Sequence, residues 1–565
     1  MKLTGSEIIV KTLIEQGVTD VFGYPGGQIL NVYDALYKYS DKINHVLTAH
    51  EQGAAHAADG YSRATGKVGV CIATSGPGAT NLVTGIATAM LDSVPMVAIT
   101  GNVPCSLIGK DSFQEIDITG ITLPITKHNF FVHKVEDLAD TIREAFSIAK
   151  SGRPGPVLVD VPKDVQLASC EFTEGEVAEK IPLPKAKDKK LLEAIELIKE
   201  SKRPYIYIGG GAAGLGMGKE IVDFAKRIDA PIGCTFMGLS AIPDGCDRFL
   251  GMQGMHGHYA SSVAQNEADL IIGVGVRFSD RATGNVQKYA KGSKIIQLDP
   301  DFSEIGKNVR VDCGIVGDVE HSFKYIAAAA EEKKNPEWMA RIAELRAEEA
   351  AFDKEIAEKS TAKLSPRDVF DVINERKPAG TVIATDVGQH QMWTAQLVKF
   401  DRTRRFVSSG GLGTMGFGLG AAIGARVASG DTTVLITGDG SFGMNLNELA
   451  TAVSHNIPVI IVLMNNGVLG MVRQWQTLFF GKRYSNTVLA DRKTDFVKLA
   501  EAFGAVGIRA TDKAEFDAAF ARALELGTTV VIDTVIDKDE FVLPMLPPGG
   551  SVDEIITVVD KEDKK

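Results

Sequence analysis

TVLITGDGSFGMNLNELATAVSHNIPVIIVLMNNGVLG, residues 433–470, is the stretch that decides the fold of this chain. It holds two continuous apolar runs separated by a helical pattern. The first run ends in Gly438-Asp439-Gly440-Ser441 and the second in Asn465-Asn466. Apolar runs without alternation are typical of strands buried on both faces, as in parallel sheets covered by helices. The stretch therefore predicts a strand–helix–strand unit.

Asp439 and Asn466 are 27 residues apart (466 − 439), a spacing that suits one such unit. If the two strands are adjacent, both side chains lie at the carboxyl edge of the sheet, where open α/β sheets bind ligands. Carboxylate and amide oxygens suit Mg2+, and the free N–H groups at the start of a helix suit phosphate. A GDG sequence alone is more typical of a plain glycine-rich turn, but GDG with NN at this spacing favours a metal–phosphate site.

The alternation of apolar runs and helical patterns recurs along the rest of the chain. It defines a first block (1–165), a second block (186–345) and a third block (364–545), with an aperiodic linker at 175–190 and a charged helical stretch at 337–360. The predicted fold class is α/β, with three doubly wound parallel-sheet domains. The predicted strands are VGVCIAT (68–74), PMVAITG (95–101), GPVLVDVP (155–162), PYIYIGGG (204–211), ADLIIGVGVRF (268–278), SKIIQLDPD (293–301), TVIATDVG (381–388), TTVLITGDG (432–440) and PVIIVLMNN (458–466).

Composition excludes several classes of protein. The 565 residues carry a formal net charge of −11, which argues against nucleic acid or an anionic membrane as a partner. Six cysteines without a C-x-x-C pair predict neither a zinc site nor a disulfide framework, and they fit a reducing cytoplasm. No run of 18 apolar residues occurs, and the start of the chain predicts a capped amphipathic helix rather than a targeting peptide.

GDG with NN resembles the signature of thiamine-diphosphate enzymes, whose chemistry needs a second feature. A carboxyl group must exchange a proton with the aminopyrimidine of the cofactor, and burial favours this by raising the pKa of the carboxyl. The candidate is Glu51 in VLTAHEQGAAHAADGYSRATG, which precedes a helix of small residues. Taken alone, Glu51 is more typical of a charge at a helix N-terminus. It lies in the first block, whereas the metal motif lies in the third. Thiamine enzymes bind their cofactor between such domains of two subunits.

Further motifs resemble the catalytic large subunit of the acetohydroxyacid synthase (acetolactate synthase) family over essentially the whole chain. The resemblance implies that the three blocks bind the pyrimidine of thiamine diphosphate, FAD, and the diphosphate with Mg2+, in that order. The motifs are GYPGGQILNVYDAL (23–36), HEQGAAHAADGYSRATG (50–66), TSGPGATNLVTGIATA (74–89), FQEIDI (113–118), ITKHNF (125–130), GVRFSDR (275–281), SGGLGTMGFGLGAAIGA (409–425) and MVRQWQ (471–476).

The resemblance also implies roles for residues of the thiamine site. Glu51 is the activating carboxylate, and Met415 is the wedge that folds the cofactor into its V shape. Asp439, Asn466 and the carbonyl of Val468 hold the metal; the Val468 position is often His in the family, so its role rests on the carbonyl alone. The implied contacts of the cofactor are Gly27, Val387, Gly388, Gln389, His390, Gly413, Met415, Gly440, Ser441, Gly470 and Met471.

The second block is implied to hold FAD in a structural, non-redox role. The residues alone indicate an FAD site less strongly, because GGGAAG after a strand is a weak nucleotide-binding signal and no G-x-G-x-x-G occurs. The implied FAD contacts are Arg153, Gly209, Gly210, Gly211, Gly254, Met255, His256, Gly275, Arg277, Asp280, Arg281, Asp299 and Asp318. The implied substrate channel comprises Phe113, Gln114, Lys127, Arg277 and Trp475. His128 and His455 are interpreted as surface or helix-end polar residues.

The activity implied by the resemblance is decarboxylation of pyruvate and transfer of the two-carbon unit to pyruvate or 2-ketobutyrate, giving 2-acetolactate or 2-aceto-2-hydroxybutyrate for valine, leucine and isoleucine synthesis. A homodimer or a dimer of dimers and a separate small regulatory subunit are implied as well. FAD-dependent pyruvate oxidase and the FAD-free catabolic acetolactate synthase are alternatives that GVRFSDR and MVRQWQ disfavour. Glu51 disfavours glyoxylate carboligase. A non-catalytic nucleotide-binding scaffold is disfavoured by the presence of Glu51, Asp439 and Asn466.

Overall fold

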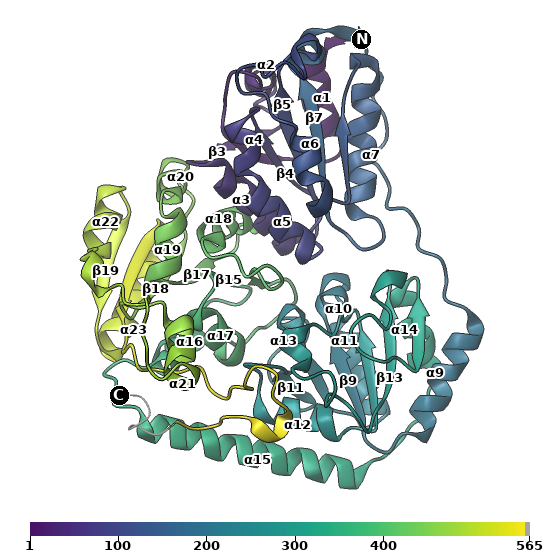
Figure 1. Ribbon diagram of the computed structural model, residues 1–565, viewed down its shortest axis with the longest axis vertical. Coiled ribbons are helices and arrows are strands. Elements are labelled where there is room, and N and C mark those ends of the chain that lie inside the picture. Colours follow the sequence, from purple (N-terminus) through teal and green to yellow (C-terminus); the bar gives the residue numbers. More distant parts are fainter. Residues whose placement is uncertain (560–565) are drawn as a thin grey trace.

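The computed structural model describes residues 1–559, and it contains three six-stranded parallel sheets flanked by helices (Figure 1). The predicted fold class is thereby confirmed. All nine predicted strands are present, and the nine other strands of the sheets include all six edge strands. A further two-stranded antiparallel pair joins β1 (Lys2–Thr4) to β8 (Ser169–Glu171).

The first sheet has the order β3-β2-β4-β5-β7-β6. Helix α1 begins after Thr4, whose side chain and that of Glu7 form a capping box. The strands are β2 (Asp20–Gly23), β3 (Asn44–Leu47), β4 (Gly69–Ala73), β5 (Met96–Asn102), β6 (His128–Phe131) and β7 (Pro156–Pro162). The helices are α1 (Gly5–Glu15), α2 (Leu30–Lys38), α3 (Glu51–Thr65), α4 (Pro77–Asn81), α5 (Val83–Leu91), α6 (Ile118–Thr122), α7 (Leu138–Lys150) and α8 (Lys163–Leu167).

The second sheet has the order β11-β10-β9-β12-β13-β14. Its strands are β9 (Pro204–Ile208), β10 (Ile232–Cys234), β11 (Phe249–Met252), β12 (Leu270–Val274), β13 (Lys294–Asp299) and β14 (Cys313–Val316). Its helices are α9 (Asp188–Glu200), α10 (Gly210–Leu215), α11 (Gly218–Arg227), α12 (Tyr259–Glu267), α13 (Asp280–Thr283) and α14 (Val319–Ala329). Helix α15 (Pro336–Lys359) is the predicted charged helix, and it runs along one edge of the molecule beneath α12 (Figure 1).

The third sheet has the order β16-β15-β17-β18-β20-β19. Strands β17 and β18 pair in parallel, Gly438 beside Met464, so the adjacency expected for the metal motif is confirmed. The strands are β15 (Val382–Thr385), β16 (Phe406–Val407), β17 (Thr433–Gly438), β18 (Ile460–Asn465), β19 (Val506–Ala510) and β20 (Val530–Val535). The helices are α16 (Pro366–Arg376), α17 (Gln389–Leu397), α18 (Phe417–Ser429), α19 (Asp439–Asn445), α20 (Glu448–Ser454), α21 (Gly470–Phe479), α22 (Phe496–Ala502) and α23 (Lys513–Leu526).

Helices α3 and α18 join the first and third sheets through a crossing that only glycine permits. A Cβ atom on Gly60 would lie 2.0 Å from the carbonyl oxygen of Ala421, and one on Gly424 would lie 1.8 Å from that of Ala57. The backbones are therefore in direct contact, and the small residues of both helices pack in one buried cluster. Because α3 begins at Glu51, this crossing fixes that residue against the third block.

The C-terminal segment after β20 returns to the second block, where its residues 545–556 form a strap (Figure 1). The backbone N–H of Leu546 donates to the carbonyl of Met255 at 2.7 Å, and that of Asn285 donates to Gly550 at 3.2 Å. The strap therefore ties the predicted FAD-binding segments to the third block. Among the described residues, no helix combines the length and apolar character needed to cross a bilayer.

Candidate active site

Asp439 follows β17 at the carboxyl edge of the third sheet, as the sequence predicts. Its side chain is buried, and burial raises the pKa of the carboxyl to about 6. The backbone N–H groups of Gly440 and Gly467 act in the opposite direction and favour the charged form. Gly467 belongs to the turn after β18. The Asp439 carboxylate therefore links the end of β17 to the end of β18.

Asn466 and its neighbours form the other half of the same edge. The Asn466 amide donates to Gln389 Oε1 at 3.2 Å, and its own oxygen accepts from the backbone N–H of Val468 at 3.3 Å. A Cβ atom on Gly470 would lie 2.0 Å from Gln389 Oε1, so the Gln389 side chain packs directly on the start of α21. The structure thus places Gln389, Asn466 and Gly470 in mutual contact.

The loop after β15 adds groups that fit a diphosphate. His390 is buried, and this burial lowers the pKa of its imidazole to about 3, so the ring is neutral. Its Nε2 makes no hydrogen bond within residues 1–559, which leaves a buried polar atom for a ligand oxygen. Ser441 Oγ donates to the carbonyl of Val387 at 2.7 Å, and Met415 reaches the edge of Gly440. Gly388, in the loop between β15 and α17, and Gly413, in the loop between β16 and α18, both have positive φ, at 153° and 67°.

The donor set at this edge suits a hard cation better than a soft one. No three His, Cys, Asp or Glu side chains gather as a metal cluster anywhere in residues 1–559. The available groups are one carboxylate (Asp439), one amide oxygen (Asn466) and the backbone carbonyl of Val468. Such an incomplete set of oxygens is what Mg2+ uses when phosphate and water supply the remaining ligands. The residues therefore fit Mg2+ held jointly with a diphosphate.

Glu51 lies at the first turn of α3, and its side chain is 9% exposed. Asn81 at the end of α4 donates to Glu51 Oε2 at 2.9 Å. A Cβ atom on Gly78 would lie 3.1 Å from Glu51 Oε1, so the loop that begins TSGPG packs directly against the carboxylate. Sequence reasoning missed Asn81, although it lies within a motif quoted above, because its contact depends on how α4 folds back.

The residues predicted to line the substrate channel lie in different settings. Phe113 is 84% exposed, whereas Gln114 has a positive φ of 61° and packs on Gly76. Gly27 is exposed and its carbonyl accepts from Lys163. Trp475 is half-buried on α21 and contacts Phe479 edge to face, with ring centroids 5.8 Å apart. Phe113 is thus open to solvent, whereas Gln114 and Trp475 are partly covered.

Lys127 is bound to the C-terminal end of α7. Its Nζ donates to the carbonyls of Ile148 and Ser151 at the end of α7, at 2.5 and 2.6 Å. Burial lowers the pKa of this amine to about 8. The side chain borders a mostly apolar cavity of about 290 Å³ between α7 and residues 181–183. Nothing in residues 1–559 brings its amine to Glu51.

The second block presents buried charged groups at the predicted FAD segments. Arg277 is partly buried and makes no side-chain hydrogen bond or ion pair within residues 1–559; burial and neighbouring Arg153 lower its pKa. Arg153 itself pairs with Glu304 at 2.7 Å. Burial raises the pKa of Asp299 to about 6. Acidic and basic groups thus face one another here without full pairing, which leaves room for a polar ligand.

Glycines and a second orphan histidine complete this region. A Cβ atom on Gly209 would lie 2.0 Å from the carbonyl oxygen of Gly275, so β9 and β12 meet closely at their ends, with Gly210 and Gly211 opening α10. His256 Nδ1 is buried without a hydrogen-bond partner in the described chain, and burial lowers the pKa of this imidazole to about 4. Asp318 caps α14 through the N–H of His321, and Asp280 and Arg281 are exposed.

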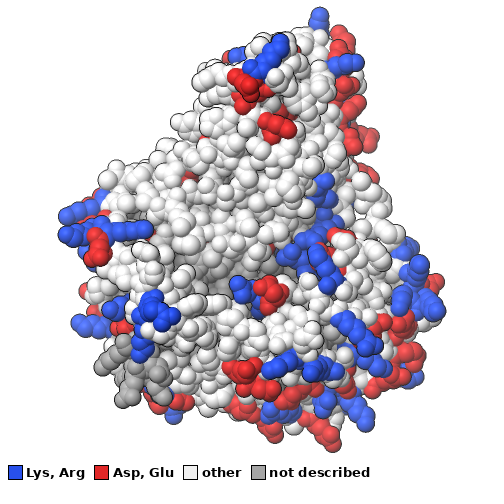
Figure 2. All heavy atoms as spheres, viewed as in Figure 1, with Lys and Arg blue, Asp and Glu red and all other residues white. Residues whose placement is uncertain are grey.

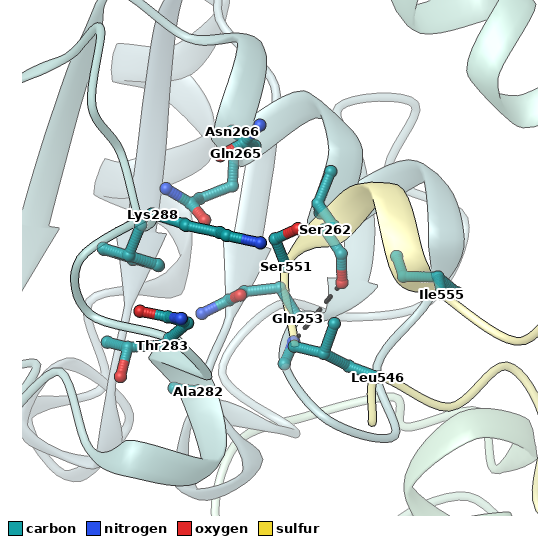
Figure 3. A pocket seen from close by; sticks show the side chains of 14 residues that line it. Gln253, Ser262, Gln265, Asn266, Ala282, Thr283, Lys288, Leu546, Ser551 and Ile555 are labelled. Atoms are coloured by element: carbon teal, nitrogen blue, oxygen red, sulfur yellow. Dashed lines mark hydrogen bonds between the residues drawn. The ribbon is translucent and has the colours of Figure 1, made fainter. Parts of the chain in front are cut away.

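A small polar pocket lies beneath the strap, next to Gly254 (Figure 3). Its volume of about 30 Å³ suits one or two water molecules rather than a cofactor. Lys288 extends across it toward Ser551, and the N–H of Gly254 donates to Ser262 Oγ at 3.4 Å (Figure 3). The pocket therefore borders the predicted FAD segment without being the site itself.

Comparison with known proteins identifies the family. Profiles of the thiamine pyrophosphate enzymes match in three parts: the N-terminal TPP-binding domain at residues 3–121, the central domain at 191–326 and the C-terminal TPP-binding domain at 386–534. The chain is 46% identical to the "Probable acetolactate synthase large subunit" of Methanocaldococcus jannaschii over 100% of this chain and 96% of that protein.

Two bacterial large subunits of acetolactate synthase are similar to the chain to the same degree. The chain is 45% identical to the acetolactate synthase large subunit of Corynebacterium glutamicum, over 98% of this chain and 90% of that protein. It is also 45% identical to the acetolactate synthase isozyme 2 large subunit of Escherichia coli K12, over 98% of this chain and 99% of that protein. The chain therefore belongs to the acetolactate synthase large subunits, a family of thiamine pyrophosphate (thiamine diphosphate) enzymes.

Proposed function

We propose that this protein decarboxylates pyruvate and transfers the two-carbon unit to a second 2-keto acid, either pyruvate or 2-ketobutyrate, in branched-chain amino-acid synthesis. The observation that carries the proposal is the Asp439–Asn466 edge of the third sheet, whose donor set fits Mg2+ and a diphosphate, in a chain that also presents Glu51. Bound thiamine diphosphate supplies the electron sink for loss of carbon dioxide. The residues of this chain bind it, orient it and move its protons.

Each part of the third block has a proposed task. Asp439, Asn466 and the carbonyl of Val468 hold Mg2+, while His390 Nε2 donates to a diphosphate oxygen. Gln389 and the glycine edge at Gly440 and Gly470 let the backbone approach the diphosphate. Met415 supports the cofactor in its folded shape. Val387, Gly388, Gly413, Ser441 and Met471 complete the contacts.

Glu51 is proposed to hold and return the proton at the aminopyrimidine ring nitrogen. Burial and the hydrogen bond from Asn81 support this role by orienting the carboxylate. General acid–base help of this kind accelerates a reaction about 10²–10⁴-fold. Arg277 is proposed to bind the carboxylate of the acceptor, because a guanidinium without a partner can donate two parallel hydrogen bonds. Phe113, Gln114, Lys127, Trp475 and the backbone at Gly27 border the path to it.

Assembly as a homodimer or a dimer of dimers is proposed for the active form. Figure 2 shows a broad face with almost no charged side chains over the region where α3, α5, α18 and α19 lie. Exposed apolar side chains on or next to these elements include Leu91 at the end of α5, Leu412 before α18 and Met444 on α19. Such a patch supports self-association. In addition to the contacts that α3 and its preceding turn make with α18 and α20 of the same chain, Glu51 of one subunit would then face the Asp439 edge of its partner across a two-fold interface. Because the relatives are named large subunits, a separate small subunit is proposed as a further partner.

FAD is proposed as a structural ligand of the second block, because the reaction involves no net oxidation. The unpartnered His256 and Arg277 and the close glycine edge of Gly209 and Gly275 support it. The proposed contacts also include Arg153, Gly210, Gly211, Gly254, Met255, Asp280, Arg281, Asp299 and Asp318. Flavin should remain oxidised through turnover.

Product identity tests the proposal. Incubation with pyruvate, thiamine diphosphate, Mg2+ and FAD should yield 2-acetolactate, and added 2-ketobutyrate should yield 2-aceto-2-hydroxybutyrate as well. Accumulation of free acetaldehyde would instead indicate a simple decarboxylase. Sustained bleaching of flavin with formation of acetate or acetyl phosphate would indicate an oxidase.

A further inference from the structure

Helix α20 of the third block binds the turn that precedes Glu51. Three residues at positions i, i+3 and i+7 along α20 and its cap, Glu448, Thr451 and His455, face this turn. The N–H of Ala49 donates to Glu448 Oε2 at 3.1 Å and to Thr451 Oγ1 at 3.0 Å. The N–H of Leu47 donates to His455 Nε2 at 3.0 Å. His455 is thus a helix-end residue, as the sequence suggests, but it also links two blocks.

Glu448 is the centre of this contact. Its side chain is fully buried, and its Oε2 also accepts from Thr451 Oγ1 at 2.6 Å. Its other oxygen, Oε1, makes no hydrogen bond within the described chain. A Cβ atom on Gly53 would lie 2.1 Å from Glu448 Oε1, so the carboxylate presses against the first turn of α3. The side chain therefore touches the backbone on both sides of Glu51.

A buried carboxylate with one oxygen unpaired carries a desolvation cost, which a purely structural contact would not require. Burial raises the pKa of Glu448, and the nearby charge of Glu51 adds to this shift. Within residues 1–559, Asn81 supplies the only side-chain hydrogen bond to the Glu51 carboxylate itself. The position of Glu51 thus depends on the turn that α20 holds.

We infer that Glu448, with Thr451, is a positioning residue that sets the Glu51 carboxylate for proton exchange with the cofactor. The inference rests on the proposed function. Only Leu446 and Asn447 separate α20 from α19, which begins at Asp439. Two neighbouring helices therefore carry the proposed metal ligand and hold the turn that precedes Glu51. Weakening the contact should disturb proton transfer more than cofactor binding.

The test uses the full-length protein saturated with thiamine diphosphate and Mg2+. Exchange of the cofactor's C2 proton for deuterium is followed by rapid quench and NMR, and cofactor affinity and thermal unfolding are measured in parallel. Glu448→Ala should slow exchange at least tenfold, and Thr451→Val should slow it several-fold, while affinity changes less than twofold. Thr451→Ser, which keeps the hydroxyl, should restore the wild-type rate. Ser454→Ala is the matched control on the same helix, because its hydroxyl bonds only back to Thr451.

Glu51→Gln distinguishes the positioning role of Glu448 and Thr451 from the proposed role of Glu51 in proton exchange. If Glu51→Gln slows exchange but Thr451→Val and Glu448→Ala behave like Ser454→Ala, the positioning role is wrong. Reduced affinity with a wild-type exchange rate at saturation would also overturn it, since that result assigns the contact to binding alone. If Glu51→Gln exchanges at the wild-type rate, the proposed function itself fails. Should Glu448→Ala not fold, Thr451→Val and its serine rescue decide.

Discussion

The carboxyl edges of the third and second sheets differ in how far the chain itself satisfies their polar groups. At the third sheet, Asn466, Gln389 and the backbone at Gly470 already touch, and N–H groups stabilise Asp439. At the second sheet, Arg277 has no partner within the described residues. The difference teaches that contacts within the chain already hold the edge of the third sheet in place, whereas Arg277 at the edge of the second sheet is left for the ligand proposed there.

The same difference decides what can be predicted from the sequence. Asp439 and Asn466 close two neighbouring strands of one strand–helix–strand unit, so spacing and apolar runs suffice to predict their meeting. The second edge draws on Arg153, the glycines after β9, His256 and Arg277, which come from separate segments. No local sequence pattern predicts that these residues meet, and only the family resemblance suggests it.

The largest effect should follow from Asp439→Ala. The substitution removes the only anionic ligand proposed for Mg2+, so Mg2+-dependent retention of thiamine diphosphate should weaken at least 100-fold, on the order expected for loss of a metal ligand or its support. Calorimetric titration of the cofactor with and without Mg2+ measures it. Asp439→Asn should have a smaller effect than Asp439→Ala, since asparagine keeps an oxygen ligand without the charge. Unchanged affinity in the alanine variant would refute the metal assignment.

Arg277→Met should separate stability from function at the second edge. Loss of a charge-assisted pair of hydrogen bonds raises the KM for the acceptor 2-keto acid about 10–100-fold. The unfolding temperature of the FAD-free protein should rise, because an unpaired buried cation disappears. Steady-state kinetics and thermal unfolding measure the two effects. A fall in stability with an unchanged KM would mean that Arg277 only supports the fold.

Acid pH should destabilise both edges through their neutral histidines. Burial depresses the folded pKa of His390 to about 3 and of His256 to about 4, below the ordinary value near 6.5. The unfolded chain then binds more protons, so stability is complete above pH 6.5 and is lost as pH falls toward 4. The slope should approach about 1.4 kcal/mol per pH unit for each histidine.

Denaturant unfolding of the cofactor-free protein between pH 7 and pH 5 measures this slope. His256→Gln and His390→Gln should each reduce it, and His133→Gln, on the surface, is the control. An unchanged slope in both buried-site variants would show that these two histidines do not titrate on unfolding as described.

The smallest effect is expected at Trp475. In the proposed site, its half-buried ring on α21 would narrow the space beside the cofactor. Packing of the ring against the extra methyl of 2-ketobutyrate would be worth about 1 kcal/mol, or roughly fivefold. Trp475→Leu should therefore lower the preference for 2-ketobutyrate over pyruvate while acetolactate formation persists. Product ratios from a mixed-substrate incubation measure it. Lost stability with an unchanged ratio would leave Trp475 as a packing residue.

About half of the fold follows from sequence pattern. Nine strands come from continuous apolar runs, but all six edge strands are missed: β16 has two residues and β6 reads HNFF, too short or too mixed to show a pattern. The contacts between blocks cannot be predicted from the sequence pattern either. The Gly60–Ala421 crossing and the bond of Ala49 to Glu448 depend on how two sheets dock, which no single stretch encodes.

Subunit complementation tests the central claim most directly, namely that Glu51 and the Asp439 edge act on one cofactor across a two-fold interface. Glu51→Gln and Asp439→Ala chains, each inactive alone, are mixed, and purified heterodimers are assayed for acetolactate. Each heterodimer carries one site with both lesions and one with neither, so about half of the wild-type activity per dimer should return. Verified heterodimers that remain inactive would contradict the account.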